Sequence, residues 1–348
     1  NFYLQIQILQ KIKNMTIISV SLNEIESHTI RALENHGAAS WVAKEVAKAV
    51  RVAEAENNKI CGLYYLDSYC KQLQSGRVDG QIQPEVAQPK SGSIYVDAKD
   101  GFAQAAFSKG LQSAVESAKE NGICLFVIAH SHTCTSLGYF TAQIAKHGLI
   151  GIGTTNAPAC VSPPGGNKPI LGTNPISMAV PSPNKTVAFQ FDQSTSAIAI
   201  GKIRMAAAAN EAIPEGWAID RDGNPTTNAE AALGGSLLSS GGYKGYGFGL
   251  MAEVLASALT GSVSSINAPP LKTTNDEPHS LGQSYILIDP DFNGKKDQFS
   301  EHISKLSTAV EHQPKARLPG SKKKLSSNIE IDATLWDQVL KLASSQPI

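Results

Sequence analysis

The sequence carries no excess of charge of either sign and no cysteine pattern typical of a secreted protein. Its 348 residues include 30 Lys plus Arg and 30 Asp plus Glu, so the formal net charge is zero. Because nucleic-acid and polyanion binders need an excess of basic residues on one face, this balance argues against both classes. The five cysteines are odd in number and form no CxxC pair, which favours reduced thiols in a cytoplasmic protein.

Three further features are missing. No apolar run approaches the ~20 residues that span a bilayer, so we expect no membrane partner. No GxGxxG motif follows a strand and opens a helix, so the ordinary dinucleotide-binding fold is not predicted. The turn Asp220-Arg221-Asp222-Gly223 resembles the start of a calcium loop but lacks the later glutamate. We therefore predict a plain turn there and no metal site.

The N-terminal quarter has the period of amphipathic helices. Apolar residues recur at helical spacing over residues 22–52, and Gly37 divides them into two predicted helices. Residues 59–80 are predicted to form a turn and a further helix. A polar, proline-containing segment at 80–91 marks a domain boundary. Residues 1–14 precede the first methionine and lack the cleavage site of a signal peptide, so we expect a leader from outside the natural start.

From residue 93 onward the pattern becomes that of an α/β domain. Predicted strands are 94–96, 123–129, 149–154 and 283–289, and predicted helices are 101–121, 137–146, 202–209 and 333–344. The strand 123–129 ends directly at the polar segment His130-Ser131-His132-Thr133-Cys134-Thr135-Ser136. In layered α/β folds ligands collect at such strand ends, so this segment is a candidate binding loop.

The most informative stretch of the chain is Gly165–Lys202. It contains a glycine-rich loop and two short apolar runs, 176–180 and 187–191, which predict buried strands bounded by Pro, Gly and Asn. Thr173 and Asn174 would present small polar groups to a ligand, and Asp192 sits at a strand end. The pattern alone is compatible both with a plain hairpin and with the wall of a binding site.

A second glycine-rich stretch, Gly241–Gly247, opens a predicted helix. Backbone N–H groups at a helix N-terminus form a natural anion site, and Lys244 adds a positive charge. The spacing is not that of a Walker motif. Contact with a phosphate and close helix packing through glycine are both compatible with this segment.

Together these segments resemble the malate/L-lactate dehydrogenase type-2 family, which includes sulfolactate and ureidoglycolate dehydrogenases and the Δ1-piperideine- and Δ1-pyrroline-2-carboxylate reductases. The resemblance extends from about Leu22 to Ala343. Its most specific segments are Leu171–Pro175, Asp192–Lys202, Ile213–Asp220 and Gly241–Gly247. The segment AHSHTC at 129–134 and Leu281-Gly282-Gln283 are closest to the cyclic imine reductases.

The resemblance implies an α/β (α+β) fold of the L-sulfolactate/malate dehydrogenase type, with a non-Rossmann NAD(P)-binding domain on a largely antiparallel sheet and a helical lobe from both termini. We expect a helical lobe at 15–90, a cofactor-binding and catalytic domain at 91–300, and a C-terminal segment, 301–348, that packs back on the helical lobe. The resemblance also implies a homodimer that uses NADP or NAD and a small-molecule substrate.

The resemblance also implies which residues form the site, by matching positions of this chain to those of the family. Asp192 would be the acidic member of a proton relay. The implied cofactor contacts are His132, Thr133, Cys134, Thr135, Ser136, Val180, Pro181, Ser182, Lys244, Arg317 and Gly320. The implied substrate contacts are Tyr65, Thr173 and Asn174.

The chain departs from the family where the chemistry takes place. Family members carry Ser-His-Gly and then an arginine, where His donates a proton and Arg holds the substrate carboxylate. This chain has Ile60, Cys61 and Tyr65 at these positions, and Thr133 replaces a second loop histidine. Loss of a general acid costs ~10²–10⁴-fold in rate. Cys61 and His132 are candidate replacements for the proton donor, and Tyr65 is otherwise a packing residue on its helix.

Three functions are therefore compatible with the sequence. The first is an NAD(P)H-dependent reductase of a small cyclic 2-imino acid, Δ1-pyrroline- or Δ1-piperideine-2-carboxylate. The second is a malate- or L-lactate-type 2-hydroxyacid dehydrogenase. The third is a catalytically impaired family member that retains the scaffold for binding or structure.

Overall fold

The fold is described from a computed structural model of the chain. It describes residues 16–183, 186–275, 277–321 and 326–346, so the predicted leader, 1–14, lies outside the described residues. Two compact units are present, Asn1–Gln81 with Lys322–Ile348, and Ile82–Ser321. We expected domain boundaries near residues 90 and 300, whereas the compact units divide at 81 and 321.

The smaller unit combines helices with a two-stranded sheet. Its elements are β1 (Ile17–Ser21), α2 (Leu22–Asn35), α3 (Ser40–Ala55), η1 (Lys59–Cys61), η2 (Leu63–Tyr65), α4 (Leu66–Gln74), β11 (Asn328–Asp332) and α11 (Ala333–Ser344). β1 pairs antiparallel with β11, and α11 packs on α2, so the C-terminal segment returns to the N-terminal helices. The two helices predicted on either side of Gly37 are confirmed as α2 and α3.

The first helix of this unit begins at a capping box. The Ser21 hydroxyl accepts a hydrogen bond from the Glu24 N–H at 3.2 Å, and the Glu24 carboxylate accepts one from the Ser21 N–H at 3.0 Å. Both bonds satisfy donors that the helix itself leaves without partners. The apolar period then places Ile25 and Leu33 in the core, where both are fully buried.

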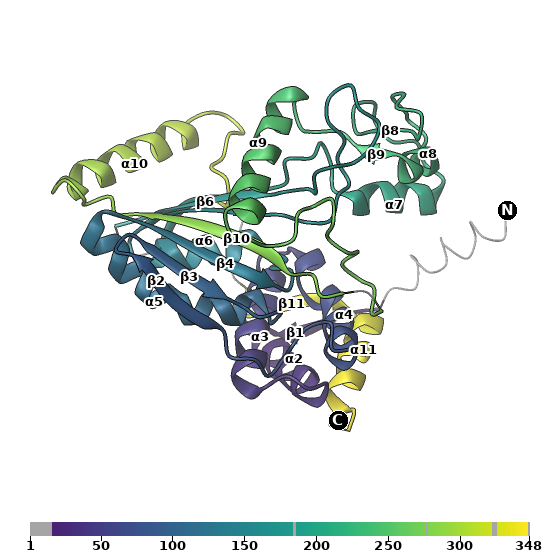
Figure 1. The fold of residues 1–348 in the computed structure, drawn as a ribbon, viewed down its shortest axis with the longest axis horizontal. Helices are drawn as coiled ribbons and strands as arrows, with labels where there is room; N and C mark the ends of the chain where they lie inside the picture. The colour runs from purple at the N-terminus through teal and green to yellow at the C-terminus, as the bar shows by residue number, and fades with distance from the viewer. Residues whose placement is uncertain (1–15, 184–185, 276, 322–325, 347–348) are drawn as a thin grey trace. The chain divides into compact units, whose positions relative to one another are not determined.

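A seven-stranded sheet organises the larger unit (Figure 1). In spatial order its strands are β2 (Glu85–Lys90), β3 (Ser93–Asp97), β4 (Ile123–Ser131), β10 (Leu281–Ile288), β5 (Ile150–Thr155), β6 (Ile176–Pro181) and β7 (Val187–Gln193). Every neighbouring pair is antiparallel except β3 with β4. The predicted largely antiparallel, non-Rossmann α/β fold is therefore confirmed.

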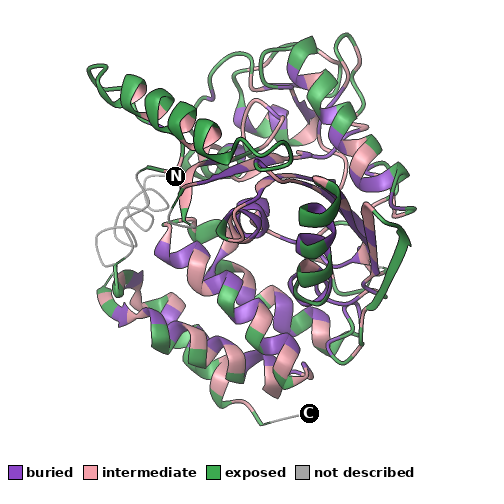
Figure 2. Ribbon diagram, turned by 90° about the vertical axis from the view of Figure 1, so that its left-hand side faces the viewer, coloured by how far each residue is buried: buried purple, intermediate pink, exposed green. Residues whose placement is uncertain are grey.

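Alternation along β10 shows how the two faces of the sheet are covered. The Tyr285 ring packs against Phe126 of the neighbouring strand β4 and against Phe107 and Phe140. Phe107 lies in α5 (Ala103–Asn121) and Phe140 in α6 (Leu137–Lys146), the two helices that cover that face. Ser284 points to the other face and donates to the Leu255 carbonyl oxygen. Leu255 lies in the π-turn η3 (Val254–Ala258), which continues α9 (Tyr243–Glu253). Figure 2 colours many residues of the central strands as buried.

A second, smaller core lies within the same unit. It collects apolar residues from α7 (Ile200–Ala209), β8 (Ala218–Ile219), α8 (Ala229–Gly234) and β9 (Ser236–Leu237). Buried members include Val161, Leu171, Ile203 and Leu237, and the partly buried Trp217 and Tyr246 pack against them. This core supports the loop that precedes α9.

Three sequence expectations need correction. The segment 80–91, expected as a polar boundary, contains β2, an edge strand whose residues are all exposed. The run 187–191, expected as a buried strand, forms the opposite edge and is mostly half-buried. Helix α10 (Lys296–Glu311) was not predicted, and none of its residues is buried. Apolar periodicity arises where one face of an element is buried. The two edge strands and α10 are exposed or half-buried, so the pattern on which the predictions depend is a poor guide to them.

Among the described residues, no helix has both the length and the apolar character needed to cross a membrane.

Close packing between β10 and η3 gives a stability prediction. A Cβ on Gly282 would lie 1.7 Å from the Ala256 carbonyl oxygen, whereas one on Gly201 of α7 would meet nothing within 4 Å. We expect Gly282→Ala to lower the free energy of unfolding by about 1–3 kcal/mol or more, because backbone must shift. Gly201→Ala should raise it by about 0.5–1 kcal/mol through helix propensity. Urea unfolding measures both, and equal effects of the two substitutions would contradict the packing described.

Candidate active site

Several strand ends meet at one edge of the large sheet. The register pairs Leu281 with Ser131, Gln283 with Thr155, and Ile176 with Gln193. The end of β4, the end of β7 and the start of β10 therefore lie along the same edge, where the predicted binding loop and Asp192 also lie.

Backbone strain is concentrated at this edge. Of the nine non-glycine residues with positive φ in the described part of the chain, six lie in or next to strands here: Lys99, Asp100, His130, Thr135, Asn174 and Ser280. Positive φ is unfavourable for residues with a Cβ and persists where surrounding structure enforces it, which is common in functional sites. This concentration marks the edge as the candidate active site.

The structure brings Asp192 and the loop 132–136 together. The Asp192 Oδ2 accepts hydrogen bonds from the Gly138 N–H at 2.7 Å and from the Ser136 hydroxyl at 3.4 Å. Ser136 caps α6, so the carboxylate lies at the positive end of that helix, where a negative charge is stabilised. A Cβ on Gly138 would lie 2.7 Å from Gln190 Nε2 and 3.0 Å from the Asp192 Cβ, so glycine permits this approach.

The binding loop itself is anchored from beneath. The His132 N–H donates to the Gly101 carbonyl oxygen at 2.8 Å. Its ring is buried, 4.4 Å from the His279 ring and 5.3 Å from the Phe102 ring, centroid to centroid. The Cys134 carbonyl oxygen accepts from the Thr135 hydroxyl at 2.7 Å and from Gln104 Nε2 at 3.3 Å. The loop is thus preorganised, and the His132 side chain has the packing of a core residue.

Tyr285 is a buried polar residue that sequence reasoning missed. Its phenol is completely buried in β10, and among the described residues its hydroxyl has no hydrogen-bond partner. Burial raises the pKa of Tyr285 well above its ordinary value, and the nearby Cys134 and Asp192 raise it further. The hydroxyl is therefore neutral and lies near the candidate site. In the sequence, Tyr285 lies within an apolar run, where a tyrosine looks like any other buried strand residue, so nothing there singled it out.

The predicted substrate residues before β6 also tie elements together. Asn174 is buried, and its Nδ2 donates to Glu253 Oε2 at 2.8 Å and to the Gly249 carbonyl oxygen at 3.2 Å. The Thr173 carbonyl oxygen accepts from the Thr195 N–H at 2.9 Å. Asn174 thus joins the start of β6 to α9, and its contact with a substrate stays a prediction.

Val180, Pro181 and Ser182 lie at the C-terminal end of β6, on the side of the sheet away from the loop 132–136. A pocket of about 350 Å³ opens there, lined by Pro181 and Ser182 together with two cationic side chains, Lys119 and Lys296, and two carboxylates, Asp289 and Asp291. Val180 as a whole residue is only 2% exposed, and it pairs with Phe189 of β7, so it belongs to the core of the sheet. The loop 132–136 and residues 180–182, both predicted cofactor contacts, therefore lie at opposite ends of the strands.

The remaining predicted cofactor residues flank this sheet. Lys244 is exposed in the first turn of α9, beside a cavity of about 450 Å³ lined by Trp217, Ser239 and Gly242. Arg317 is exposed. Gly320, at φ +82°, passes along the outer edge of β7, where Pro319 accepts from the Gln190 N–H at 3.2 Å.

Cys61 and Tyr65 lie in the smaller unit, on the 3₁₀ turns between α3 and α4. These turns are built around Glu54, a buried carboxylate that accepts from the Leu63 N–H at 2.7 Å. A Cβ on Gly62 would lie 2.2 Å from Glu54 Oε1, so this position requires glycine. Tyr65 packs against Tyr69 at 5.6 Å between ring centroids. Glu54 is a positioning residue that the sequence pattern did not reveal.

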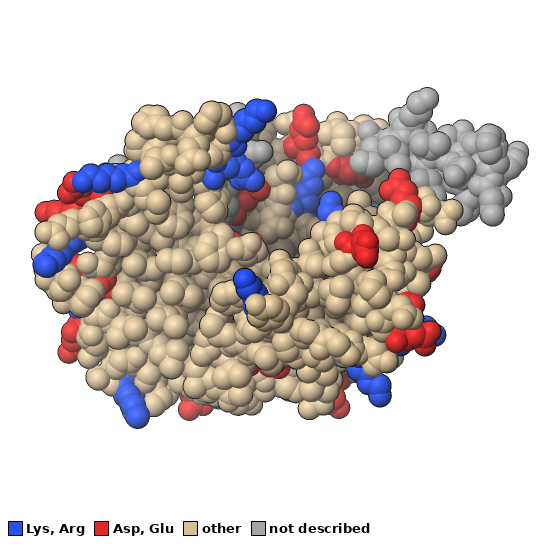
Figure 3. Space-filling model, turned by 90° about the horizontal axis from the view of Figure 1, so that it is seen from above, with Lys and Arg blue, Asp and Glu red and all other residues tan. Residues whose placement is uncertain are grey.

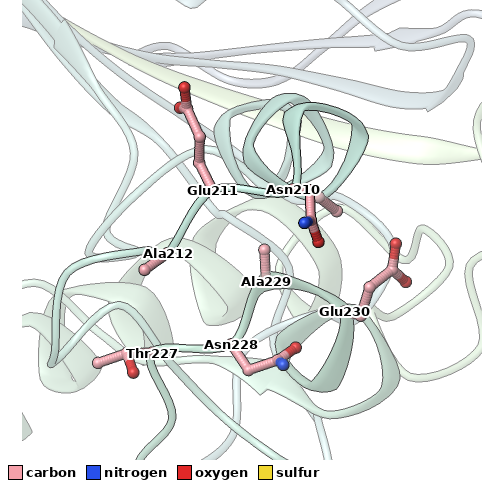
Figure 4. Close-up of a pocket in the computed structure, with 8 residues that line it drawn as sticks. Asn210, Glu211, Ala212, Thr227, Asn228, Ala229 and Glu230 are labelled. Atoms are coloured by element: carbon pink, nitrogen blue, oxygen red, sulfur yellow. The ribbon is translucent and has the colours of Figure 1, made fainter. Parts of the chain in front are cut away.

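Other features do not coincide with the predicted site. A pocket of about 270 Å³ between α7 and α8 is lined by Asn210, Glu211, Asn228 and Glu230, and Figure 4 shows their arrangement. It contains none of the predicted site residues.

Charges of both signs are interspersed on the face shown in Figure 3. No group of three or more His, Cys, Asp or Glu side chains suited to a metal ion occurs in the ranges described.

These features define a class first, a mixed α/β fold built on a largely antiparallel sheet whose strand order is not that of a Rossmann fold. The family model described as malate/L-lactate dehydrogenase matches residues 20–339. The chain therefore belongs to the malate/L-lactate dehydrogenase family of NAD(P)-dependent oxidoreductases, whose members are enzymes.

Individual relatives cover nearly the whole chain. It is 35% identical to the (2R)-3-sulfolactate dehydrogenase (NADP(+)) of Chromohalobacter salexigens over 94% of this chain and 98% of the relative. It is 33% identical to a Δ1-pyrroline-2-carboxylate/Δ1-piperideine-2-carboxylate reductase of Pseudomonas putida, over 88% and 90%. The solved Δ1-piperideine-2-carboxylate reductase of Pseudomonas syringae pv. tomato has a TM-score of 0.85 at 31% identity, covering 93% of this chain and 99% of that one.

Burial of Glu54 predicts a pH-dependent stability. Burial raises the pKa of Glu54 above its ordinary value of 4.5, against the lowering effects of the Leu63 N–H and Lys59. The ionised carboxylate is thus disfavoured in the folded state, and this penalty disappears as pH falls through the folded pKa toward 4.5. We expect Glu54→Gln to raise the melting temperature at pH 7, with a difference that shrinks on acidification. Calorimetry between pH 7 and pH 4 measures it.

Glu24→Gln is the matched control with the opposite sign. Hydrogen bonds from Ser21 lower the pKa of Glu24, so its charge stabilises the fold above pH 4.5 and this stabilisation is lost as pH falls through the folded pKa. Glu24→Gln should therefore lower the melting temperature at pH 7. A Glu54→Gln protein that is less stable than the parent at every pH would show that the carboxylate's hydrogen bond outweighs its burial.

Proposed function

We propose that the protein is an NAD(P)H-dependent reductase of a small cyclic 2-imino acid, Δ1-pyrroline- or Δ1-piperideine-2-carboxylate. The observation that carries this proposal is a contact between the two segments resembling the cyclic imine reductases. The Ser131 hydroxyl donates to the Leu281 carbonyl oxygen at 3.2 Å, and Gln283 Nε2 donates to the Ser131 hydroxyl at 2.6 Å. Segments 129–134 and 281–283 thus form one structural feature of the candidate site.

The residues present fit an extended dinucleotide. One sheet edge has a preorganised polar loop, 132–136, and the other has a pocket with Lys119, Lys296 and Ser182. Lys244 at the start of α9, together with Arg317 and Gly320, would hold the anionic part. When bound, the nicotinamide supplies the hydride. The apolar sheet beneath the loop would exclude water from the reacting face.

Proton supply is the part of the mechanism that depends on this chain's own residues. Asp192, held by the Gly138 N–H, is the proposed acidic member of the relay. Cys61 is the proposed donor at the position of the family histidine, and His132 is the alternative. Tyr65, Thr173 and Asn174 are the proposed substrate contacts. By the same resemblance we infer a homodimer acting in the cytoplasm.

The test is consumption of NADPH and NADH with both cyclic imines, pyruvate and oxaloacetate as substrates. The proposal expects turnover with one or both cyclic imines at the highest kcat/KM in the panel. Binding of each cofactor is measured separately by nicotinamide fluorescence. A folded protein that binds cofactor but reduces no cyclic imine would overturn the proposal.

A second candidate is a 2-hydroxyacid dehydrogenase. The 35% identity to a relative named for (2R)-3-sulfolactate and NADP(+) favours it. Oxidation of (2R)-3-sulfolactate, malate and L-lactate with NADP⁺ and NAD⁺ distinguishes this activity from the first, because the cyclic imines are then poor substrates.

A third candidate is a catalytically impaired family member, favoured by Ile60, Cys61 and Tyr65 at the positions of the family's proton donor and carboxylate clamp. This candidate predicts an inactive parent. It also predicts that the combined variant Ile60→Ser, Cys61→His and Tyr65→Arg gains activity. Ordinary enzyme rates in the parent would exclude it.

Substitution of Asp192 tests the proposed proton relay. We expect Asp192→Asn to lower kcat by ~10²–10⁴-fold, the range for loss of a general acid or base. The amide keeps the shape and an acceptor for the Gly138 N–H, so the melting temperature should change little. The exposed Asp337→Asn in α11 is the matched control. An unchanged kcat in Asp192→Asn would exclude Asp192 from the relay.

The two lysines at the far sheet edge predict an effect on cofactor preference. Lys119 and Lys296 line the pocket beside Ser182 together with the carboxylates Asp289 and Asp291, and the two lysines would attract the 2′-phosphate of NADP. We expect both cofactors to be accepted. We also expect Lys119→Met with Lys296→Met to raise the KM for NADPH more than the KM for NADH. Lys146→Met in α6 is the control, and equal changes in both KM values would refute the assignment.

A further inference from the structure

Asn174, in the turn that leads into β6, has a strained backbone. Its φ is +33°, and Pro175 follows it directly. A residue with a Cβ adopts positive φ at a cost, and a following proline favours an extended conformation instead. Such a conformation persists only where the surrounding structure enforces it, and strained residues of this kind are concentrated at functional sites. Other residues of the fold must therefore hold Asn174 in place.

A carboxylate at the end of α9 is the main partner of Asn174. Glu253 is the last residue of α9, and its Oε2 accepts a hydrogen bond from Asn174 Nδ2 at 2.8 Å. The same carboxylate accepts the Ser265 N–H on Oε1 at 2.7 Å and the Ser265 hydroxyl on Oε2. All three partners are donors. A carboxylate satisfies them together because both of its oxygens only accept.

The side-chain amide of Asn174 is fully used within this network. Nδ2 also donates to the Gly249 carbonyl oxygen at 3.2 Å, so both of its hydrogens are bonded, and Oδ1 accepts from the Ser265 hydroxyl at 3.3 Å. Asn174 and Ser265 are both completely buried. The Asn174 amide therefore has no donor left for a ligand and no exposed surface on which to bind one.

The neighbouring Thr173 is held differently. Its carbonyl oxygen accepts from the Thr195 N–H at 2.9 Å and from the Thr195 hydroxyl at 3.1 Å, which fixes the backbone of the turn. The residue is half-buried, and its own hydroxyl makes no hydrogen bond to another described residue. A hydroxyl both donates and accepts, so it suits a carboxylate or an imine nitrogen. The turn thus offers a ligand the Thr173 hydroxyl and not the Asn174 amide.

The network is fastened to the body of the unit on two sides. Directly after Glu253, α9 widens into the π-turn η3, where the Leu255 carbonyl oxygen accepts from the Ser284 hydroxyl of β10. Such π-turns within helices are frequent at functional sites. On the other side, the Ala159 N–H donates to the Ser265 carbonyl oxygen at 2.9 Å. Glu253 and Ser265 are therefore themselves fixed, as residues that hold a strained turn must be.

We propose that Glu253 and Ser265 are positioning residues of the reaction, which hold Asn174 in its strained conformation so that the Thr173 hydroxyl meets the substrate. Asn174 then acts through the turn that it fixes and not through its amide, which refines the contact proposed above. The identity of the substrate, a small cyclic 2-imino acid, rests on the proposed function, whereas the hydrogen-bond network does not.

Glu253→Gln tests this assignment with little change of shape. The amide has one acceptor oxygen and places an NH₂ group against one of the three donors, so the network cannot stay complete. We expect kcat/KM for the cyclic imine to fall by ~10²-fold, the scale of loss for a misplacement of ~1 Å. The dissociation constant of NADPH should stay unchanged. Glu230→Gln, at an exposed position of α8, is the matched control and should change neither quantity.

Binding without turnover gives a second readout. A cyclic imine and NADP⁺ are both oxidised forms and cannot react, so calorimetry with NADP⁺-loaded protein measures the affinity for the imine alone. We expect Glu253→Gln and the isosteric Thr173→Val each to weaken imine binding by ~10-fold, as for loss of a hydrogen bond to a charged group. The double variant should be no weaker than either single one, because both remove the same contact.

Nuclear magnetic resonance reports the network without any ligand. After selective isotope labelling of asparagine, the side-chain amide protons of Asn174 should exchange slowly with solvent in the parent and faster in Glu253→Gln. Rapid exchange in the parent overturns the assignment. So do additive losses in the double variant, or a dissociation constant of NADPH that rises as much as that of the imine, which marks a merely structural role.

The same samples separate this assignment from the proposed function. A parent with slow exchange that binds no cyclic imine contradicts the proposed function. The binding cycle is then measured with (2R)-3-sulfolactate and NADPH, both reduced forms, and non-additive losses there still support Glu253 as a positioning residue. A parent that binds neither substrate overturns both.

Discussion

The position of β10 between β4 and β5 is the constraint on which the larger unit depends. This strand comes from residues 281–288, yet it pairs with two strands that lie more than a hundred residues earlier. Both of its edges are hydrogen-bonded, and its two faces carry the aromatic core on one side and η3 on the other. Gly282 permits the approach of the Ala256 carbonyl oxygen. Because β10 joins β4 to β5, it brings the end of β4 and the end of β7 to the same side of one continuous sheet.

The candidate active site is a consequence of that assembly. Once the strand ends are aligned, the loops that leave them must turn sharply, and His130, Thr135 and Asn174 adopt positive φ. Asp192 is then held at the N-terminus of α6 by the Gly138 N–H. The fold itself fixes the carboxylate, and the proposed proton relay would require such preorganisation.

In the smaller unit, a buried carboxylate likewise fixes a turn that carries predicted site residues. Glu54, a buried carboxylate, holds the turn that carries Cys61 through the Leu63 N–H. Gly62 is required by the close approach of the Glu54 oxygen. The fold therefore positions the turn that carries Cys61 through Glu54 and Gly62, whatever side chains the turn presents.

Much of this protein was determined by local sequence. The period of apolar residues gave α2, α3, α5, α6 and most strands of the sheet, because burial of a regular element leaves a regular pattern. The glycine-rich and polar segments pointed to the loop 132–136 and to Asp192. Tertiary structure alone decided the strand order, the hydrogen bonds of Asp192 and the roles of Glu54 and Tyr285, because these depend on contacts between residues far apart in the chain.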